Sequence, residues 1–285
     1  MSKYLYFVLF AFSCGSKVHK ESLNTVINNA VVYRTIHEAI EDTIAGVQVT
    51  LIQDFQDSSN SGATILVLPG WDFERHRWLK ETSLRALAKT RHYRLILPEM
   101  RRSIYTTMFY PETTLEARQE KTGKWLIDTF IPAIQKKYNL LTPRARNFVL
   151  GLSTGGRGAF YCAWKAPFVF IAAASLSGDF NQSKMPTDFL MKSVYGDYER
   201  NKVRWDTEDN LYRVAESIVQ PLFIAHGKAD KVVPFGQSLA FATKTQRTNA
   251  KVKTYFVKEA THDFKFWNSA LEPAINFFDE IKESF

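Results

Sequence analysis

A glycine-rich corner that carries one serine, Gly151–Gly156, constrains the fold of this chain more than any other feature. The stretch reads Gly-Leu-Ser-Thr-Gly-Gly and follows an apolar run that ends at Leu150. Residues of helical character come after it, so the pattern predicts a strand, a sharp turn and a helix. A serine at such a turn adopts strained backbone angles, and its neighbours two positions away must be nearly free of side chain. Gly151 and Gly155 meet that requirement, which makes Ser153 a candidate nucleophile.

Glycines in this arrangement have two other common uses, a plain loop and a phosphate cradle. A P-loop places Lys and then Ser or Thr after its last glycine, whereas Arg157 and Gly158 follow here. A dinucleotide-binding fingerprint needs G-x-G-x-x-G, which the stretch lacks. Phosphate binding is therefore disfavoured, and the plain loop stays open until partners for Ser153 are found.

Apolar runs along the chain predict strands that alternate with helices. This alternation indicates an α/β fold with a mostly parallel central sheet and helices on both faces. Two further strands upstream, Val31–Ile36 and Val47–Phe55, are expected to pair antiparallel at one edge of the sheet. The expected parallel strands are Thr64–Leu68, Tyr93–Leu97, Asn147–Leu150, Phe170–Leu176, Pro221–Ala225 and Val252–Val257. The expected helices are Glu74–Ala88, Thr114–Tyr138, Thr154–Lys165, Gly236–Thr245 and Trp267–Ile281.

Length and charge narrow the class of protein. The chain has 285 residues and contains no repeat, low-complexity tract or Pro/Ser linker, so we expect one domain over residues 21–285. Its formal net charge is +8, but the 37 Lys and Arg residues are scattered among 29 acidic ones and no nucleic-acid motif is present. This balance disfavours nucleic-acid binding and favours an anionic surrounding such as a membrane surface.

Residues 1–20 have the pattern of a leader and tether. Lys3 precedes the apolar run Tyr4–Phe12, which is too short to span a bilayer but suits the core of a signal peptide. We therefore expect export to the periplasm or the cell surface. Ser13-Cys14-Gly15 resembles a bacterial lipoprotein processing site, at which Cys14 would be lipidated and anchor the protein to a membrane. Ordinary secretion and an unprocessed N-terminus remain the alternatives.

A serine hydroxyl becomes a good nucleophile only when a base takes its proton and a carboxylate orients that base. His262 lies just after the last expected strand and is the candidate base. Asp230 follows the preceding strand and is the candidate carboxylate, while His226 is interpreted as structural, in a tight turn that aims Asp230. The chain order Ser153, Asp230, His262 is that of the α/β-hydrolases.

Other acids and histidines have weaker positions. Asp206 and Asp209 lie in an irregular stretch with no strand to position them, and Asp263 adjoins His262 and is expected to point elsewhere. Solvated positions are enough to explain the remaining histidines, which are His19, His37, His76 and His92.

An acyl-transfer site also needs two fixed N–H donors for the oxyanion. The backbone N–H of Thr154, at the start of the expected helix, is one candidate and gains from the positive end of the helix dipole. The second candidate is the N–H of Trp71, because Gly70 lets the chain bend toward the site after the strand that ends at Leu68. The alternative for this segment is a plain tight turn.

Four segments together resemble the α/β-hydrolase superfamily and are most similar to the esterase group that includes esterase D and S-formylglutathione hydrolase. They are Gly151–Ala159, Ala174–Gly178, His226–Asp230 and His262–Trp267, and the resemblance extends from Val47 to the C-terminus. It implies a serine hydrolase that cleaves carboxylic esters through an acyl-enzyme, with no metal or organic cofactor. The absence of HExxH and paired CxxC spacings agrees with that expectation. The chain departs from the group at Thr154, where Met is common, and at Pro69-Gly70, which replaces the usual His-Gly.

The resemblance implies a small-molecule or polysaccharide-linked ester as substrate. Two irregular stretches that follow strand ends, Arg101–Thr113 and Asp179–Asn210, are where open α/β sheets bind ligands. The expected pocket wall is Arg101, Arg102, Tyr105, Phe109, Tyr110, Asp179 and Trp267. For each of these residues, packing under a loop is the alternative.

Two further functions remain open at this point. The same triad serves acyltransferases, thioesterases and peptidases, and a hydrolase fold without catalysis serves as a binding module. Such modules commonly lose a triad member, whereas this sequence has all three.

Overall fold

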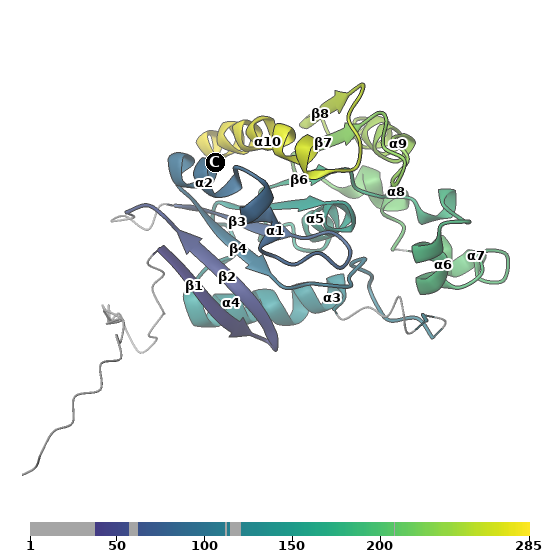
Figure 1. The fold of residues 1–285 in the computed structure, drawn as a ribbon, viewed down its shortest axis with the longest axis horizontal. Helices are drawn as coiled ribbons and strands as arrows, with labels where there is room; N and C mark the ends of the chain where they lie inside the picture. Colours follow the sequence, from purple (N-terminus) through teal and green to yellow (C-terminus); the bar gives the residue numbers. More distant parts are fainter. Residues whose placement is uncertain (1–37, 57–61, 112, 115–120, 208) are drawn as a thin grey trace, which may run out of the picture. The chain divides into compact units, whose positions relative to one another are not determined.

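A central mixed sheet organises the residues that the computed structural model describes, which are 38–56, 62–111, 113–114, 121–207 and 209–285. Its strand order is β1-β2-β4-β3-β5-β6-β7-β8 (Figure 1). The strands are β1 Glu38–Ile44, β2 Val47–Gln53, β3 Ala63–Leu68, β4 Tyr93–Pro98, β5 Asn147–Leu152, β6 Ala172–Leu176, β7 Leu222–Gly227 and β8 Val252–Val257. Strands β3 to β8 pair in parallel, while β2 pairs antiparallel with both β1 and β4. The predicted fold class, including its antiparallel edge, is confirmed.

Helices cover both faces of this sheet (Figure 1). They are α1 Arg77–Glu81, α2 Leu84–Arg91, α3 Gly123–Trp125, a π-helical turn Leu126–Phe130, α4 Ile131–Tyr138, α5 Thr154–Lys165, α6 Phe189–Tyr195, α7 Lys202–Trp205, α8 Leu211–Val214, α9 Gly236–Thr245 and α10 Phe264–Ser284. Short 3₁₀ turns lie at Gln182–Lys184 and Ala215–Ser217.

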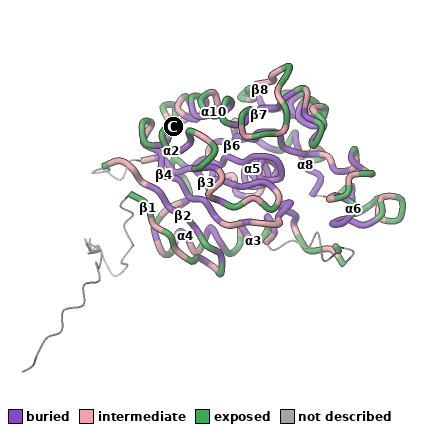
Figure 2. The backbone as a smooth tube through the Cα atoms, in the orientation of Figure 1, coloured by how far each residue is buried: buried purple, intermediate pink, exposed green. Residues whose placement is uncertain are grey.

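Alternate side chains of the central strands supply two separate apolar layers. Ile65 and Val67 of β3 pack in the layer with α1, α2 and α10. Leu66 and Leu68 pack on the other side with α4, α5 and α9. Because both faces are covered, β3, β4, β5 and β7 are buried at every position, as the tube through the backbone shows (Figure 2). This rigid double-sided core holds the carboxyl ends of the strands in fixed places.

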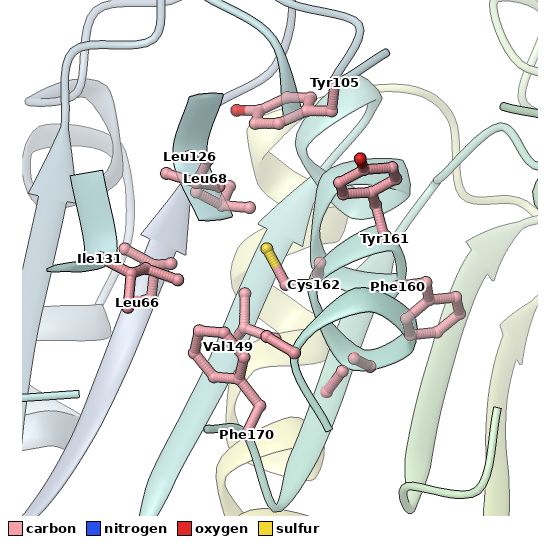
Figure 3. Close-up of a cluster of buried hydrophobic side chains, with 14 of the residues drawn as sticks. Leu66, Leu68, Tyr105, Leu126, Ile131, Val149, Phe160, Tyr161, Cys162 and Phe170 are labelled. Atoms are coloured by element: carbon pink, nitrogen blue, oxygen red, sulfur yellow. The ribbon is translucent and has the colours of Figure 1, made fainter. Parts of the chain in front are cut away.

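Cys162 belongs to one of these layers. Its sulfur lies among buried apolar side chains, Leu66, Leu68 and Val149 among them (Figure 3). Burial raises the pKa of its thiol well above the usual range, so the side chain acts as a small hydrophobic group.

The antiparallel edge has a different partner strand from the one predicted. Strand β2 pairs with β1, in the register Ile44↔Val47 to Glu38↔Gln53. The predicted partner, Val31–Ile36, lies outside the described residues. The sequence of β1, Glu-Ala-Ile-Glu-Asp-Thr-Ile, is largely polar because most of this edge strand is not buried, so no apolar run marks it.

Two predicted helices differ from the observed ones. Glu74–Ala88 is divided into α1 and α2 at Thr82, because the carboxamide oxygen of Asn268 in α10 accepts the N–H of Ser83 at 2.7 Å. The helix predicted from Thr114 begins at Gly123, after its N-cap Thr122; residues 115–120 of that prediction lie outside the described residues. Its π-helical turn ends at Phe130, two residues before Pro132, which has no N–H to donate.

The remaining predicted strands and helices are confirmed to within a few residues. None of the helices in the described ranges is long and apolar enough to cross a membrane.

Candidate active site

Ser153 occupies the sharp turn between β5 and α5. Its backbone has φ 52° and ψ −127°, values that non-glycine residues rarely adopt. Its N–H donates to the carbonyl of Leu176 at the end of β6, 2.8 Å away, which fixes the turn to the sheet. A Cβ at Gly151 would overlap the carbonyl of Gly155, and a Cβ at Gly155 would overlap the carbonyl of Leu68. Both positions flanking the serine therefore admit only glycine.

A chain of two hydrogen bonds starts at the hydroxyl of Ser153. Its Oγ lies 3.0 Å from Nε2 of His262, and Nδ1 of the same ring lies 2.7 Å from Oδ2 of Asp230. The serine directly precedes α5, the aspartate follows β7 and the histidine follows β8, so residues distant in the sequence meet at the carboxyl end of the sheet. The histidine side chain is 10% exposed and the aspartate side chain is not exposed. The structure thus brings together the nucleophile, base and carboxylate that the sequence predicts.

Four N–H groups surround the carboxylate of Asp230. Its Oδ1 accepts the backbone N–H groups of Val232 and Val233 at 2.8 and 2.9 Å. Its Oδ2 lies 3.2 Å from Nε2 of His226, in addition to its bond with His262. Burial alone would raise the pKa of Asp230, but the hydrogen bonds from His226 and His262 outweigh it and hold the pKa well below the usual range. The group is therefore a carboxylate at neutral pH.

The alternative acids are engaged elsewhere. Asp206 pairs with Arg213. The carboxylate of Asp209 accepts the N–H and hydroxyl of Thr107, both at 2.6 Å. Asp263 accepts the N–H of Phe266 at 2.9 Å and so caps α10. None of the three bonds to His262.

Trp267 lies beneath the imidazole of His262. Its indole is 1% exposed and meets the ring of His262 edge-on, with centroids 5.0 Å apart. Its Nε1 donates to the hydroxyl of Ser177 at 3.2 Å. A side chain with so little free surface supports the ring above it, and its place in the pocket wall stays a prediction.

Two backbone N–H groups near the serine donate to no acceptor among the described residues, those of Thr154 and Trp71. Thr154 is the first residue of α5, where the helix leaves its N–H groups unpaired. A Cβ at Gly70 would lie 3.1 Å from Cβ of Ser153, so the turn that carries Trp71 passes directly against the turn that carries Ser153. Both N–H groups thus belong to segments that adjoin Ser153.

The other predicted pocket residues divide into buried and accessible ones. Tyr105 is 1% exposed and donates its hydroxyl to the carbonyl of Pro69, and Asp179 is also 1% exposed. Both side chains are buried, and their place in the pocket wall stays a prediction. The accessible members are Arg101, Arg102, Phe109 and Tyr110, which are intermediate or exposed. Arg101 also forms a bridge to Phe73 in the turn that follows β3.

A buried cation that the sequence did not single out explains why Asp179 is hidden. Arg157, one helical turn after the serine, is 1% exposed and lies 3.0 Å from Oδ2 of Asp179. The same guanidinium donates to the hydroxyl of Tyr195 at 3.0 Å and to the carbonyl of Asp209. Burial raises the pKa of Asp179, although Arg157 opposes that shift. Arg157 therefore links the irregular segment after β6 to helix α5.

Metal-ligating side chains do not gather within the described ranges, where no group of three or more His, Cys, Asp and Glu residues is arranged to hold an ion. Cys14 lies outside the described residues, as do His19 and His37.

Comparison with known families matches residues 45–278 to the family described as "Putative esterase". A search of curated proteins found no match.

Solved structures share the fold. S-formylglutathione hydrolase of Staphylococcus aureus is 20% identical over 84% of this chain and 97% of its own, with a TM-score of 0.67. The fluorophosphonate-binding serine hydrolase F of the same organism is 21% identical over 84% of this chain and 96% of its own, with a TM-score of 0.64. A ferulic acid esterase is 17% identical over 86% of this chain and 98% of its own, with a TM-score of 0.63.

Proposed function

Because the chain belongs to the esterase family of α/β-hydrolases and is a carboxylic ester hydrolase, we propose that Ser153, His262 and Asp230 carry its reaction. One observation supports this assignment above the others: the continuous hydrogen-bonded chain from Ser153 Oγ through His262 to Asp230, built on a serine with φ 52°. A strained backbone at a buried corner is costly, and a catalytic role accounts for that cost better than a plain loop does.

In the first half of the reaction, Ser153 attacks the carbonyl carbon of the ester. The Oγ–C bond forms while Nε2 of His262 takes the hydroxyl proton, and the carbonyl oxygen becomes an oxyanion. Asp230 accepts a hydrogen bond from Nδ1, which keeps Nε2 free as the base and stabilises the ring once it is charged. The tetrahedral intermediate then collapses, the alcohol leaves with the proton from Nε2, and an acyl-enzyme remains.

In the second half, water replaces the alcohol. His262 takes a proton from water as the oxygen attacks the acyl carbon, and the collapse of the second intermediate returns that proton to Ser153 Oγ. The carboxylic acid leaves and the free enzyme is restored.

The oxyanion of both intermediates is assigned to the N–H groups of Thr154 and Trp71. Neither N–H has an acceptor among the described residues, and Thr154 stands at the positive end of α5. Such donors stabilise the intermediate more than the flat ester, because charge develops on the oxygen only during the reaction.

The acyl-enzyme can be tested by rapid kinetics with p-nitrophenyl acetate. Because deacylation is the slower step for such activated esters, we expect a burst of about one equivalent of p-nitrophenol per chain and a covalent acetyl group that acid quenching traps for mass spectrometry. Ser153→Ala should abolish both signals, while Ser217→Ala, at an exposed serine of a 3₁₀ turn, should retain them. Equal turnover in Ser153→Ala and the native chain would refute the assignment.

The substrate is proposed to be a small-molecule or polysaccharide-linked ester, since Arg101, Arg102, Phe109 and Tyr110 offer both charged and aromatic surface. A panel of acetyl to octanoyl esters, with and without a sugar or phenolic alcohol, would define it. A preference confined to thioesters would contradict an oxygen-ester substrate.

Export, with an anchor at Cys14, is a separate proposal that rests on the leader sequence. Cell fractionation and labelling with a palmitate analogue would test it. We expect membrane-bound, labelled protein from the native chain and no label on Cys14→Ala; an unlabelled native chain would refute the anchor.

A further inference from the structure

His226 contacts the carboxylate of Asp230 from the side opposite His262. The ring is not exposed, and neither is the side chain of Asp230. Nε2 of His226 lies 3.0 Å from the carbonyl oxygen of Val233 and 3.2 Å from Oδ2 of Asp230. Nδ1 lies 2.7 Å from the hydroxyl of Ser238 in α9. Every polar atom of the ring is thus engaged, at a place where no water is needed to satisfy it.

These contacts fix the tautomer of the ring. A carbonyl and an ionised carboxylate can only accept, so Nε2 must carry the hydrogen. The hydroxyl of Ser238 has no other acceptor among the described residues, so it donates to Nδ1, which therefore carries a lone pair. The contacts thus assign a hydrogen to Nε2 and the acceptor role to Nδ1.

We propose that His226, held in this tautomer by Ser238, is a positioning residue for the triad carboxylate. The inference rests on the proposed function. It adds His226 and Ser238 to the polar contacts that join Asp230, His262 and Ser153. One oxygen of Asp230 thus lies within 3.2 Å of both imidazoles. The Nε2–H of His226, which is also directed at the carbonyl of Val233, withdraws charge from Oδ2, so the carboxylate stabilises protonated His262 less than it would alone.

Few other charges act on this cluster. From β8 the neighbour of His226 is Phe256, and from the loop before α9 it is Phe235, whose ring centroid lies 6.0 Å away. The Nζ of Lys228 lies 5.7 Å from the ring centroid of Phe235 and is not bonded to the histidine. On the side of α10, the carboxylate of Asp263 is held by Thr261 and Phe266. His262 and Asp230 are therefore the titratable partners through which His226 acts.

The tautomer can be measured without any activity assay. Long-range ¹H–¹⁵N spectra of histidine-labelled protein distinguish the two neutral tautomers, and loss of one set of signals in His226→Gln assigns the residue. We expect the Nε2–H form. A ring with its hydrogen on Nδ1 and none on Nε2 would overturn the proposal.

Two variants of matched length test the effect on the triad. His226→Gln keeps an N–H donor near Oδ2, whereas His226→Met has the same length and no donor. We expect the acid limb of the kcat/KM profile to move up by about half a pH unit or more in His226→Met, and by less in His226→Gln. Ser238→Ala should move it in the same direction as His226→Met, and Ser238→Thr should restore the native position.

If His226 had a purely structural role, its variants would have a lower folded fraction, and the acid limb of their kcat/KM profile would not move. That result, measured on folded protein, would overturn the proposal. Failure of the proposed function is a different outcome: the native chain would then hydrolyse no ester, while the tautomer spectra would still report on His226 and Ser238.

Discussion

The indole of Trp267 meets the imidazole of His262 edge-on, with ring centroids 5.0 Å apart and planes at 85°. The indole cannot turn freely, since its Nε1 donates to Ser177 at the end of β6. The orientation of the proposed base therefore depends on a buried side chain from α10, which is itself anchored to the sheet. Asp230 fixes the same ring from Nδ1.

Replacing Trp267 by Phe should lower kcat by about tenfold and change KM little. The smaller ring loses the bond to Ser177 and leaves His262 less well oriented, while the pocket stays intact. Steady-state kinetics on one ester measure the effect. Ser177→Ala removes the same bond and should act in the same direction; a raised KM at unchanged kcat would instead place Trp267 in substrate binding.

Gly155→Ala should cost roughly 3 kcal/mol of stability, because its Cβ would overlap the backbone carbonyl of Leu68, which cannot move without the strand. Gly236→Ala is the matched control, since a Cβ there meets nothing within 4 Å and the position lies in helix α9. That variant should be neutral or more stable by about 0.5 to 1 kcal/mol. Urea unfolding measures the stability of both variants. Equal stabilities would contradict the close packing of Gly155 against Leu68.

Arg157→Met should lower the free energy of unfolding by about 3 to 5 kcal/mol, because it leaves Asp179 buried without its cation. Arg247→Ala, at an exposed ion pair with Glu216, should leave the unfolding midpoint unchanged. Hydrogen exchange would locate the effect: the segment after β6 should lose protection first. Uniform loss across the sheet would show that Arg157 does not act by tying that segment down.

Stability should fall in acid partly through Asp230. Its native pKa lies well below the usual value, so the unfolded chain binds its proton first as the pH drops. Its contribution is complete above about pH 4, the ordinary value for Asp, and is lost as the pH falls below it. Between pH 6 and 3, Asp230→Asn should therefore lose roughly 1 kcal/mol less than the native chain in urea unfolding. Parallel curves for the two proteins would contradict the shift.

The sequence located the three residues that meet in the structure because each stands where an apolar strand ends. Parallel strands end at one edge, so Ser153, Asp230 and His262 had to lie near one another once the sheet formed. The need for glycine at positions 151 and 155 could also be predicted from the sequence, because a close approach of the backbone at the serine turn requires both.

Burial in the irregular segments could not be read in the same way. Tyr105, Asp179 and Trp267 look like pocket residues by composition, yet each is held by a partner distant in the sequence: Pro69, Arg157 and Ser177, respectively. A single arginine on a helix gives no sign that it is buried. The edge strand β1 was missed for the opposite reason, because its exposed face removes the apolar run that marks a strand.

The central claim is that Ser153 is the nucleophile, and a fluorophosphonate adduct tests it most directly. The probe reacts with an activated serine hydroxyl, so one adduct per chain should form and peptide mass spectrometry should find it on Ser153. Asp230→Asn should slow its formation by about 10³-fold or more, since the base loses its orientation. An adduct on another residue, or labelling that persists in Ser153→Ala, would contradict the account.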